Sequence, residues 1–343
     1  MLVKGMMRIL IIANYKGPIG GISGQVDELH RHLTEDVGYS SAIYSTQGNV
    51  LWRIFAFFRL IAVSRKYDVL HVHGCSNMGM LPILYAIVAG KMWRKRVIVT
   101  YHGGGADEYF AKHIRFVRRW LNRADRIIVL NGYLESVFRK YDIPCEVIPN
   151  CITLSQQIAH GKYQWNAPRF ISVRHLRELY NIPCVLQAYA IMKRQLPKAT
   201  LTILGDGPLR KGLEEWVKAN KVDDVTFMGQ VPNSDMAKYY KDSDIMLSAP
   251  HIDNMPVSVL ESMNAGVLVI SSRVGGVPYL IDEGGNGLLF DDDSFTDLAD
   301  KMLWAVEHPD ESEKMIRSAY EDVKKYNWSE IREQLLPLYE QDR

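Results

Sequence analysis

Two carboxylates, Asp253 and Glu261, are separated by seven residues and flank the start of a short predicted helix. An apolar run at residues 267–270 predicts a strand, and Gly275-Gly276 then predicts a turn. The free N–H groups and positive dipole end of a helix N-terminus suit a phosphate, and a carboxylate nearby suits sugar hydroxyls. Because a nucleotide-sugar carries both groups, this segment predicts a site for such a compound.

A glycine-rich loop, residues 14–24, follows the first predicted strand and contains Gly20 and Gly21. Glycines let backbone amides approach a phosphate or a sugar closely. The loop lacks the spacing G-x-G-x-x-G, and no acidic residue closes the second strand at Ser45-Thr46, which argues against a nicotinamide-binding site. The alternative interpretation is a tight turn without a ligand.

Histidines lie at or near the ends of two predicted strands. His102 ends an apolar strand and precedes Gly103-Gly104, and ligands of doubly wound sheets bind at such strand ends. We therefore expect His102 to be a site residue. His71 and His73 alternate along another strand and point to one face; His73 is the better candidate, and both could be structural.

Arg174 ends the first predicted strand of the second half of the chain. An arginine there can hold a diphosphate through its fork of N–H donors, although a surface cluster is an equal alternative. The turn Gly205-Asp206-Gly207-Pro208 follows the next strand. Gly205 is the residue of that turn that we expect to line the site.

Together these motifs resemble those of the retaining family 4 glycosyltransferases, whose donor-site motif is Glu, seven residues, Glu. Here Asp253 stands at the first Glu. The resemblance runs from Gly20-Gly21 to Trp328 and is most specific at residues 239–290. It implies an α/β GT-B fold, in which two doubly wound, Rossmann-like domains face each other across a cleft. It also implies transfer of a sugar from a nucleotide diphosphate to an acceptor hydroxyl with retained anomeric configuration.

The resemblance also implies roles for single residues. Glu261 accepts hydrogen bonds from the ribose, Asp253 faces the hydroxyls of the transferred sugar, and His102 lies against the donor sugar and the acceptor. The expected catalytic residues are His102, Asp253 and Arg174. The expected donor-binding residues are Gly20, Gly21, Arg174, Gly205, Met255, Val257, Ser258 and Glu261.

The largest departure from the family concerns the diphosphate. Family members read Gly-Arg-Leu-x-x-x-Lys-Gly, and alignment on Leu176 puts His175 at the arginine, Tyr180 at the lysine and Arg174 at the first glycine. The residues that could replace the two missing cations are Arg174, Arg177 and Lys211. The site has no Asp-x-Asp, and residues 291–293 are interpreted as turn charge. We therefore expect no metal and no cofactor besides the donor, a UDP- or GDP-sugar.

Apolar, β-branched runs alternate with amphipathic stretches throughout the 343 residues, as expected for parallel strands covered by helices. The length predicts two domains. We assign residues 1–160 to an acceptor-side domain, 167–325 to a donor-binding domain and 326–343 to a helix that crosses back, with residues 153–166 as linker. The predicted strands are 8–13, 41–45, 69–73, 97–101, 126–130, 146–148, 169–173, 200–204, 225–228, 244–247, 267–270 and 287–290. Predicted helices include 24–35, 51–65, 80–91 and 135–140, and Ser329 is the expected cap of the last helix.

The charge is unevenly distributed. Residues 1–165 hold 21 Lys and Arg against 11 Asp and Glu, and several of these cations adjoin aromatic residues. This pattern indicates either solvated helix faces or a surface for an anionic membrane and a lipid-linked sugar acceptor. No nucleic-acid-binding motif accompanies it. Without a membrane-spanning run, a signal peptide or a Cys-x-x-Cys pair, we expect a cytoplasmic enzyme, peripheral at the inner face of the membrane.

Two other functions stay open at this point. The first is a sugar-nucleotide epimerase on the same scaffold, although acid and base carboxylates for it are not identifiable. The second is a nucleotide-sugar-binding protein that has lost activity through the departures at Asp253, His175 and Tyr180. Donor hydrolysis or transfer by the purified protein separates these functions.

Overall fold

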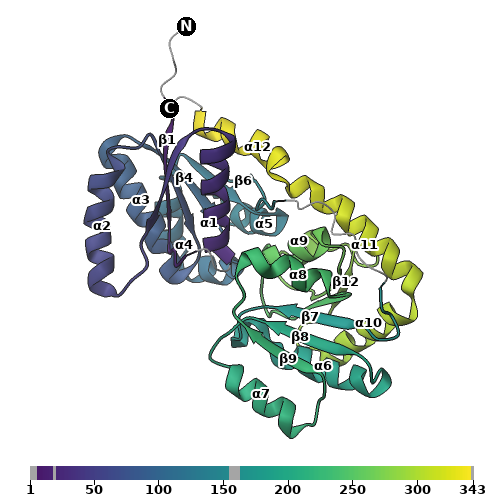
Figure 1. Ribbon diagram of the computed structural model, residues 1–343. Coiled ribbons are helices and arrows are strands. Elements are labelled where there is room, and N and C mark those ends of the chain that lie inside the picture. Colours follow the sequence, from purple (N-terminus) through teal and green to yellow (C-terminus); the bar gives the residue numbers. More distant parts are fainter. Residues whose placement is uncertain (1–5, 18–20, 154–162, 341–343) are drawn as a thin grey trace. The chain divides into compact units, whose positions relative to one another are not determined.

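The computed structural model describes residues 6–17, 21–153 and 163–340. The chain divides into two compact units (Figure 1). The first unit comprises Met1–Ile152 and Tyr326–Arg343, and the second comprises Thr153–Lys325. Each unit is built on one parallel sheet of six strands.

The sheet of the first unit has the strand order β2-β1-β3-β4-β5-β6, and its strand pairs are parallel. Its central strands are near-continuous apolar runs because helices cover both faces. The strands are β1 Arg8–Ala13, β2 Ser40–Ser45, β3 Val69–Gly74, β4 Arg96–Tyr101, β5 Arg126–Val129 and β6 Glu146–Val147.

Two helical layers cover this sheet, and each has its own apolar core. Residues of α2 to α5 pack on one face, whereas α1 and the C-terminal α12 pack on the other. The side chains of Asn49 and Asn131 cap α2 and α5 by accepting hydrogen bonds from Trp52 N and Leu134 N. The helices are α1 Gly21–Arg31, α2 Val50–Ser64, α3 Met80–Trp93, α4 Ala106–Leu121, α5 Gly132–Lys140 and α12 Trp328–Glu340.

The sheet of the second unit has the order β12-β11-β10-β7-β8-β9 and is also parallel. Its core is formed mainly by apolar residues of the strands and of α6, α10 and α11. The strands are β7 Arg169–Val173, β8 Thr200–Leu204, β9 Val225–Gly229, β10 Ile245–Ser248, β11 Leu268–Ser272 and β12 Leu288–Phe290. The helices are α6 Ile182–Gln195, α7 Arg210–Ala219, α8 Met236–Lys241, α9 Val257–Asn264, α10 Phe295–Glu307 and α11 Pro309–Val323.

The predicted fold class is confirmed: both units are α/β with parallel six-stranded sheets. Each predicted strand overlaps an observed one, and the ends agree within two residues. The predicted helix 24–35 is shifted, because α1 begins at Gly21 and the chain then forms a wider π-helical turn over His32–Asp36. Among the described residues, no helix is long and apolar enough to cross a bilayer.

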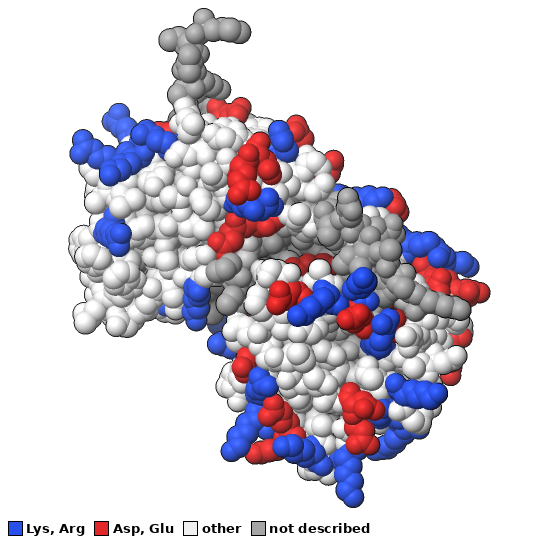
Figure 2. Space-filling view, in the orientation of Figure 1, with Lys and Arg blue, Asp and Glu red and all other residues white. Residues whose placement is uncertain are grey.

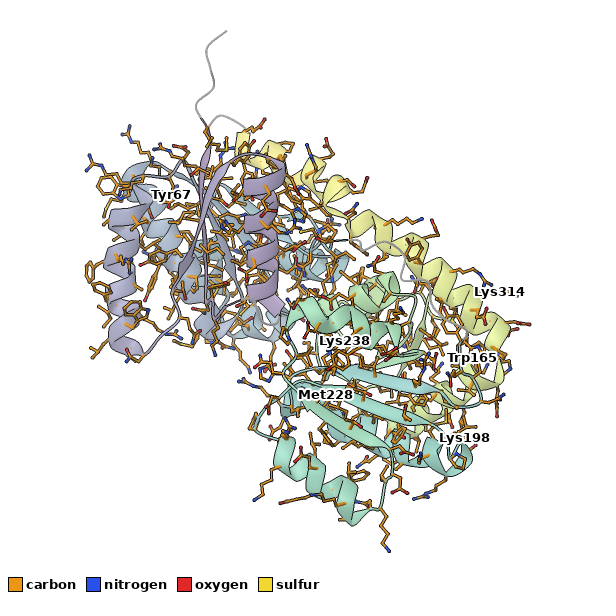
Figure 3. The ribbon with its side chains drawn as sticks, in the orientation of Figure 1. Tyr67, Trp165, Lys198, Met228, Lys238 and Lys314 are labelled. Carbon is orange, nitrogen blue, oxygen red and sulfur yellow. The ribbon has the colours of Figure 1, made fainter. Side chains whose placement is uncertain are left out.

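Two local predictions are wrong. Ser329 lies inside α12, which begins at Trp328, so it does not cap the helix. Residues 163–166 are not free linker, because Tyr163 and Trp165 pack on the core of the second unit. Trp165 lies beside α11 (Figure 3), where its Nε1 donates to Glu313 Oε1 at 3.4 Å. The rest of the predicted linker, residues 154–162, falls outside the described part of the chain.

Candidate active site

Arg174 and Asp253, two of the predicted catalytic residues, form an ion pair in the second unit. Arg174 follows β7 and Asp253 follows β10, a neighbouring strand of the same sheet. Arg174 Nη1 lies 2.9 Å from Asp253 Oδ2, and the two side chains are only 9% and 18% exposed. Arg174 Nη2 also donates to Ser248 Oγ at 2.9 Å, and its guanidinium lies 5.4 Å from the Tyr180 ring centre. The guanidinium is therefore fixed from three sides.

The geometry distinguishes Arg174 from the other residues that could replace the missing cations. Lys211 is highly exposed and pairs with Glu215, and Arg177 is exposed as well. His175, at the position of the usual arginine, is also exposed. By contrast, Arg174 Nε is buried and has no hydrogen-bond partner among the described residues. A buried donor without a partner is costly unless a ligand satisfies it.

Gly205 has a structural reason to be glycine. Its φ is +132°, and a Cβ there would lie 1.9 Å from the carbonyl oxygen of Arg174. The absence of a side chain thus lets the turn after β8 pack directly against the backbone of Arg174. Gly275 supports Asp253 in the same way, since its Cβ would lie 2.1 Å from the carbonyl oxygen of Asp253. Both glycines hold the ion pair in place through the backbone.

Helix α9 begins four residues after Asp253. Its first amides, including those of Val257 and Ser258, have no acceptor within the helix because an α-helix leaves its first four N–H groups unpaired. Ser258 Oγ is buried and has no partner among the described residues. Met255 is buried just before the helix. The helix start therefore offers donors for an anionic or sugar oxygen.

Glu261 lies one turn further along α9 and is held by a residue that sequence reasoning missed. Tyr240, buried on α8, donates its hydroxyl to Glu261 Oε2 at 2.8 Å. Burial, and then the Glu261 charge, raise the pKa of Tyr240 well above its usual value, so this hydroxyl keeps its proton. The positive charge of Arg174 lowers the same pKa, so the Arg174–Asp253 pair acts electrostatically on the Tyr240–Glu261 pair. No spacing or motif in the sequence marks Tyr240.

The first unit contains a histidine cluster at the carboxyl ends of β3 and β4. His73 Nδ1 lies 2.9 Å from His102 Nε2, and His71 Nε2 lies 2.7 Å from Thr100 Oγ1. The rings of His71 and His73 are 4.6 Å apart, which confirms that both point to one face. Tyr339 of α12 completes the cluster, with its hydroxyl 2.7 Å from His71 Nδ1. No pattern in the sequence indicates this contact, which joins residues 268 positions apart.

Burial makes the histidine cluster neutral. It lowers the pKa of His102 to about 4 and that of His71 to about 3, and it lowers the pKa of His73 as well. His73 Nε2 is buried without a partner among the described residues, whereas His102 is partly exposed. His102 thus presents an uncharged imidazole whose orientation is set by His73.

The remaining predicted residues lie in the glycine loop. Gly21 is the first residue of α1, with φ +21°, and no described atom lies within 4 Å of the position that a Cβ would take. Gly20 lies outside the described residues. Arg174, Gly205, Asp253, Ser258 and Glu261 therefore belong to the second unit, and Gly21 and His102 belong to the first.

Among the residues that the structure describes, no three His, Cys, Asp or Glu side chains are grouped so that they could hold a metal ion. All four cysteines are free; Cys151 and Cys184 are buried, and Cys75 and Cys145 are partly buried.

Comparison with known proteins identifies the family. Residues 19–156 match the family model described as Glycosyltransferase Family 4, and residues 156–322 match the one described as Glycosyl transferases group 1. The chain belongs to the family 4 glycosyltransferases. It is thus an enzyme that transfers a sugar from a nucleotide-sugar donor, and neither the epimerase nor the inactive binding protein finds support.

Individual relatives are distant. The chain is 24% identical over 285 residues to N-acetyl-alpha-D-glucosaminyl L-malate synthase from Bacillus anthracis, which covers 77% of this chain and 73% of that protein. It is 27% identical over 252 residues to alpha-monoglucosyldiacylglycerol synthase from Streptococcus pneumoniae, covering 65% of this chain and 56% of that relative. The crystal structure of Anabaena HepE in complex with UDP and glucose has a TM-score of 0.77 at 15% identity and covers 96% of this chain and 98% of HepE. The last comparison confirms the GT-B fold.

Proposed function

We propose that this glycosyltransferase moves a sugar from a UDP- or GDP-sugar to an acceptor hydroxyl with retained anomeric configuration and without a metal ion. The observation that carries the proposal is the buried Arg174 guanidinium, which is fixed by Asp253 and keeps one N–H unpaired. A fixed cation with a spare donor suits the diphosphate that leaves with the nucleotide. In this proposal the guanidinium stabilises the negative charge of the diphosphate, which a metal ion does in metal-dependent transferases.

The other residues of the second unit bind the donor around this cation. Glu261 accepts hydrogen bonds from the ribose, while Tyr240 holds its Oε2 atom in place. Ser258 and the amides from Met255 to Val257 contact oxygens of the phosphate and the sugar. Asp253 serves twice, because it orients Arg174 and faces the hydroxyls of the transferred sugar. Gly205 contributes by letting the backbone of Arg174 pack closely.

In the first unit, the residues assigned a role are His102 and the glycine loop. A neutral His102 can exchange a hydrogen bond with the transferred sugar without placing a positive charge beside an electron-poor anomeric carbon. The glycine loop that contains Gly20 and Gly21 is proposed to bind the donor or the acceptor. The family mechanism uses no separate base, since the leaving oxygen takes the acceptor proton; on this view the enzyme acts by positioning and by stabilising the diphosphate.

The identity of the donor, the independence from metal ions and the retention of configuration are tested on the purified full chain. A thermal-shift screen of UDP- and GDP-sugars should reveal a donor that raises the melting temperature, because binding stabilises the folded state. Transfer should then continue in excess EDTA, and NMR should show the same anomeric configuration in donor and product. Complete loss of transfer in EDTA, restored by magnesium or manganese, would contradict the metal-free site. An inverted product would contradict retention.

The acceptor is proposed to be a sugar or a lipid-linked sugar used for surface polysaccharide or glycolipid, with the enzyme cytoplasmic and bound at the inner membrane surface. Support comes from the excess of Lys and Arg in residues 1–165 and from the similarity to a glycolipid synthase. Four arginines line one open groove: Arg115, Arg118 and Arg119 of α4, and Arg123 just after that helix. Charge reversal at the first three should weaken binding to anionic liposomes and leave donor binding unchanged. High salt should weaken it too, because the Debye length falls to about 3 Å at 1 M.

A further inference from the structure

Helix α2 carries large apolar side chains on its solvent side as well as toward the core. Ala56, Leu60 and Ser64 face the interior and are buried. Fourteen large hydrophobic residues are exposed in the described chain, and six of them lie on this helix, with 43% to 78% of their surface exposed: Val50, Leu51, Trp52, Ile54, Phe55 and Phe58. These six residues are called the α2 apolar face below. In Figure 2 the flank over α2 is largely free of charged residues, with Lys and Arg gathered at its upper end.

The α2 apolar face is presented by a firmly packed helix. The Phe57 ring lies 5.0 Å from the Tyr85 ring of α3. Trp93, at the end of α3, donates its Nε1 to the carbonyl oxygen of Ile61 at 2.7 Å, and Arg65 lies 5.6 Å from the Trp93 ring centre. Asn49 caps the start of the helix. The exposure is therefore a property of the folded unit and not of a frayed helix.

The stretch of chain that contains the α2 apolar face is strongly basic. Between Asp36 and Asp107 the sequence has one acidic residue, Asp68. The same stretch has eight basic residues: Arg53, Arg59, Arg65, Lys66, Lys91, Arg94, Lys95 and Arg96. Helix α4, with its arginine-lined groove, packs on the same face of the sheet as α2. A partner for this layer must accept apolar side chains and carry negative charge.

The size of the α2 apolar face also argues for a partner. Six large side chains with 43% to 78% of their surface exposed present on the order of 500 Å² of apolar surface, near the upper limit for a soluble monomer. A helix with aromatic and aliphatic residues outward and arginines beside them is typical of one that lies in the interface of a membrane. Acidic headgroups above an apolar layer match both the charge and the apolar side chains.

We propose that the α2 apolar face inserts into the headgroup region of an anionic phospholipid bilayer. This inference deepens the membrane association proposed above and rests on it, and it assigns the contact to α2 in addition to the arginines of α4. Insertion adds a short-range apolar contribution that salt does not screen, whereas the flanking arginines supply the long-range attraction. The contact brings the acceptor-side unit to the surface where a lipid-linked acceptor lies.

The test uses the full chain and vesicles of phosphatidylcholine with or without phosphatidylglycerol, in the absence of donor and acceptor. The variant L51Q/F55Q/F58Q removes three side chains of the α2 apolar face. The matched control M228Q/Y279Q/F295Q removes three exposed apolar side chains of the second unit; Met228 is labelled in Figure 3. The depth to which the α2 apolar face inserts is measured by quenching of tryptophan fluorescence with brominated lipid, in the parent and in Trp52→Phe.

The parent protein and the matched control should sediment with anionic vesicles, and the α2 variant should bind on the order of 100-fold more weakly. Trp52→Phe should keep binding but lose most of the quenching. If the α2 variant binds like the parent while charge reversal on α4 abolishes binding, the α2 inference is overturned and the proposed membrane association stands. If the parent ignores anionic vesicles, both are overturned. Concentration-dependent dimers in ultracentrifugation, abolished in the α2 variant and without vesicle binding, would overturn the inference in favour of a second copy.

Discussion

Removing one partner of the Arg174–Asp253 pair should destabilise the second unit strongly. In Arg174→Met, Asp253 keeps its hydrogen bond from Asn254 N but loses its cation, and the buried Ser248 Oγ loses its donor. Breaking a buried pair costs about 3–5 kcal/mol. Because Asp253 is 18% exposed, water compensates in part, so we expect about 3 kcal/mol. For a unit of this size, that corresponds to a fall in melting temperature of roughly 6–12 °C.

Removing both partners should cost less than the sum of the two single changes. Asp253→Asn alone leaves the guanidinium without a countercharge, at a cost of about 2–3 kcal/mol. In Arg174→Met with Asp253→Asn, no buried charge is left unpaired, and the Asn side chain still accepts from Asn254 N. We therefore expect a coupling free energy of about 2 kcal/mol between the two positions.

Urea unfolding followed by circular dichroism gives the free energies of unfolding of the parent, the two single variants and the double variant. Calorimetry gives the donor affinity of each. The double variant matters most, because it should be folded and yet bind the donor at least about tenfold more weakly, having lost the diphosphate cation. Additive stability effects would refute the ion pair as an energetic unit. Parental donor affinity in the folded double variant would refute Arg174 as the diphosphate ligand.

Three further predictions concern Glu261 and the histidine cluster. Glu261→Ala should lower donor affinity by a factor on the order of 10–100, through loss of a ribose acceptor, and calorimetry showing unchanged affinity would point to a different carboxylate. His102→Ala should lower kcat more than donor affinity; parental turnover would make His102 a packing residue. The first unit should lose stability as pH falls below about 6.5, because the histidines of the unfolded chain then take up protons, whereas in the folded chain the pKa values of His71 and His102 are lowered to about 3 and about 4. The free energy of unfolding, measured by urea titration, should fall between about pH 7.5 and about pH 5 by up to about 1.4 kcal/mol per histidine and pH unit. A flat profile would contradict the lowered pKa values of the two histidines.

The fold could be predicted from the sequence because buried parallel strands have an unmistakable pattern. Runs such as Arg8–Ala13 and Leu268–Ser272 are apolar, short and followed by glycine or polar residues, so their ends are marked as well. Helix ends were harder to place. The shift of α1 depends on a π-helical turn at His32–Asp36, and the start of α12 depends on contacts of Trp328 with the first unit. Neither is encoded in local propensity.

The candidate site could be predicted where a strand end or a helix start places a residue, and not where two distant segments meet. Arg174, Asp253 and His102 all follow strands, so topology alone brings them to the carboxyl edges of the sheets. Tyr240 and Tyr339 reach the site residues from helices, and their hydroxyl contacts depend on how those helices pack. Periodicity marks such residues as buried but says nothing about the partner of a hydroxyl group.

The residues that depart from the family pattern at positions 174, 180 and 253 lie together in the structure. The family lysine is replaced by Tyr180, whose ring now lies 5.4 Å from the guanidinium of Arg174, and the first family Glu is replaced by Asp253, whose Oδ2 contacts Arg174 Nη1. His175, at the family arginine, is exposed and takes no part in these contacts. Arg174, Tyr180 and Asp253 therefore meet around a single guanidinium, and in the proposed function this arginine takes the place of the two cations of the family pattern.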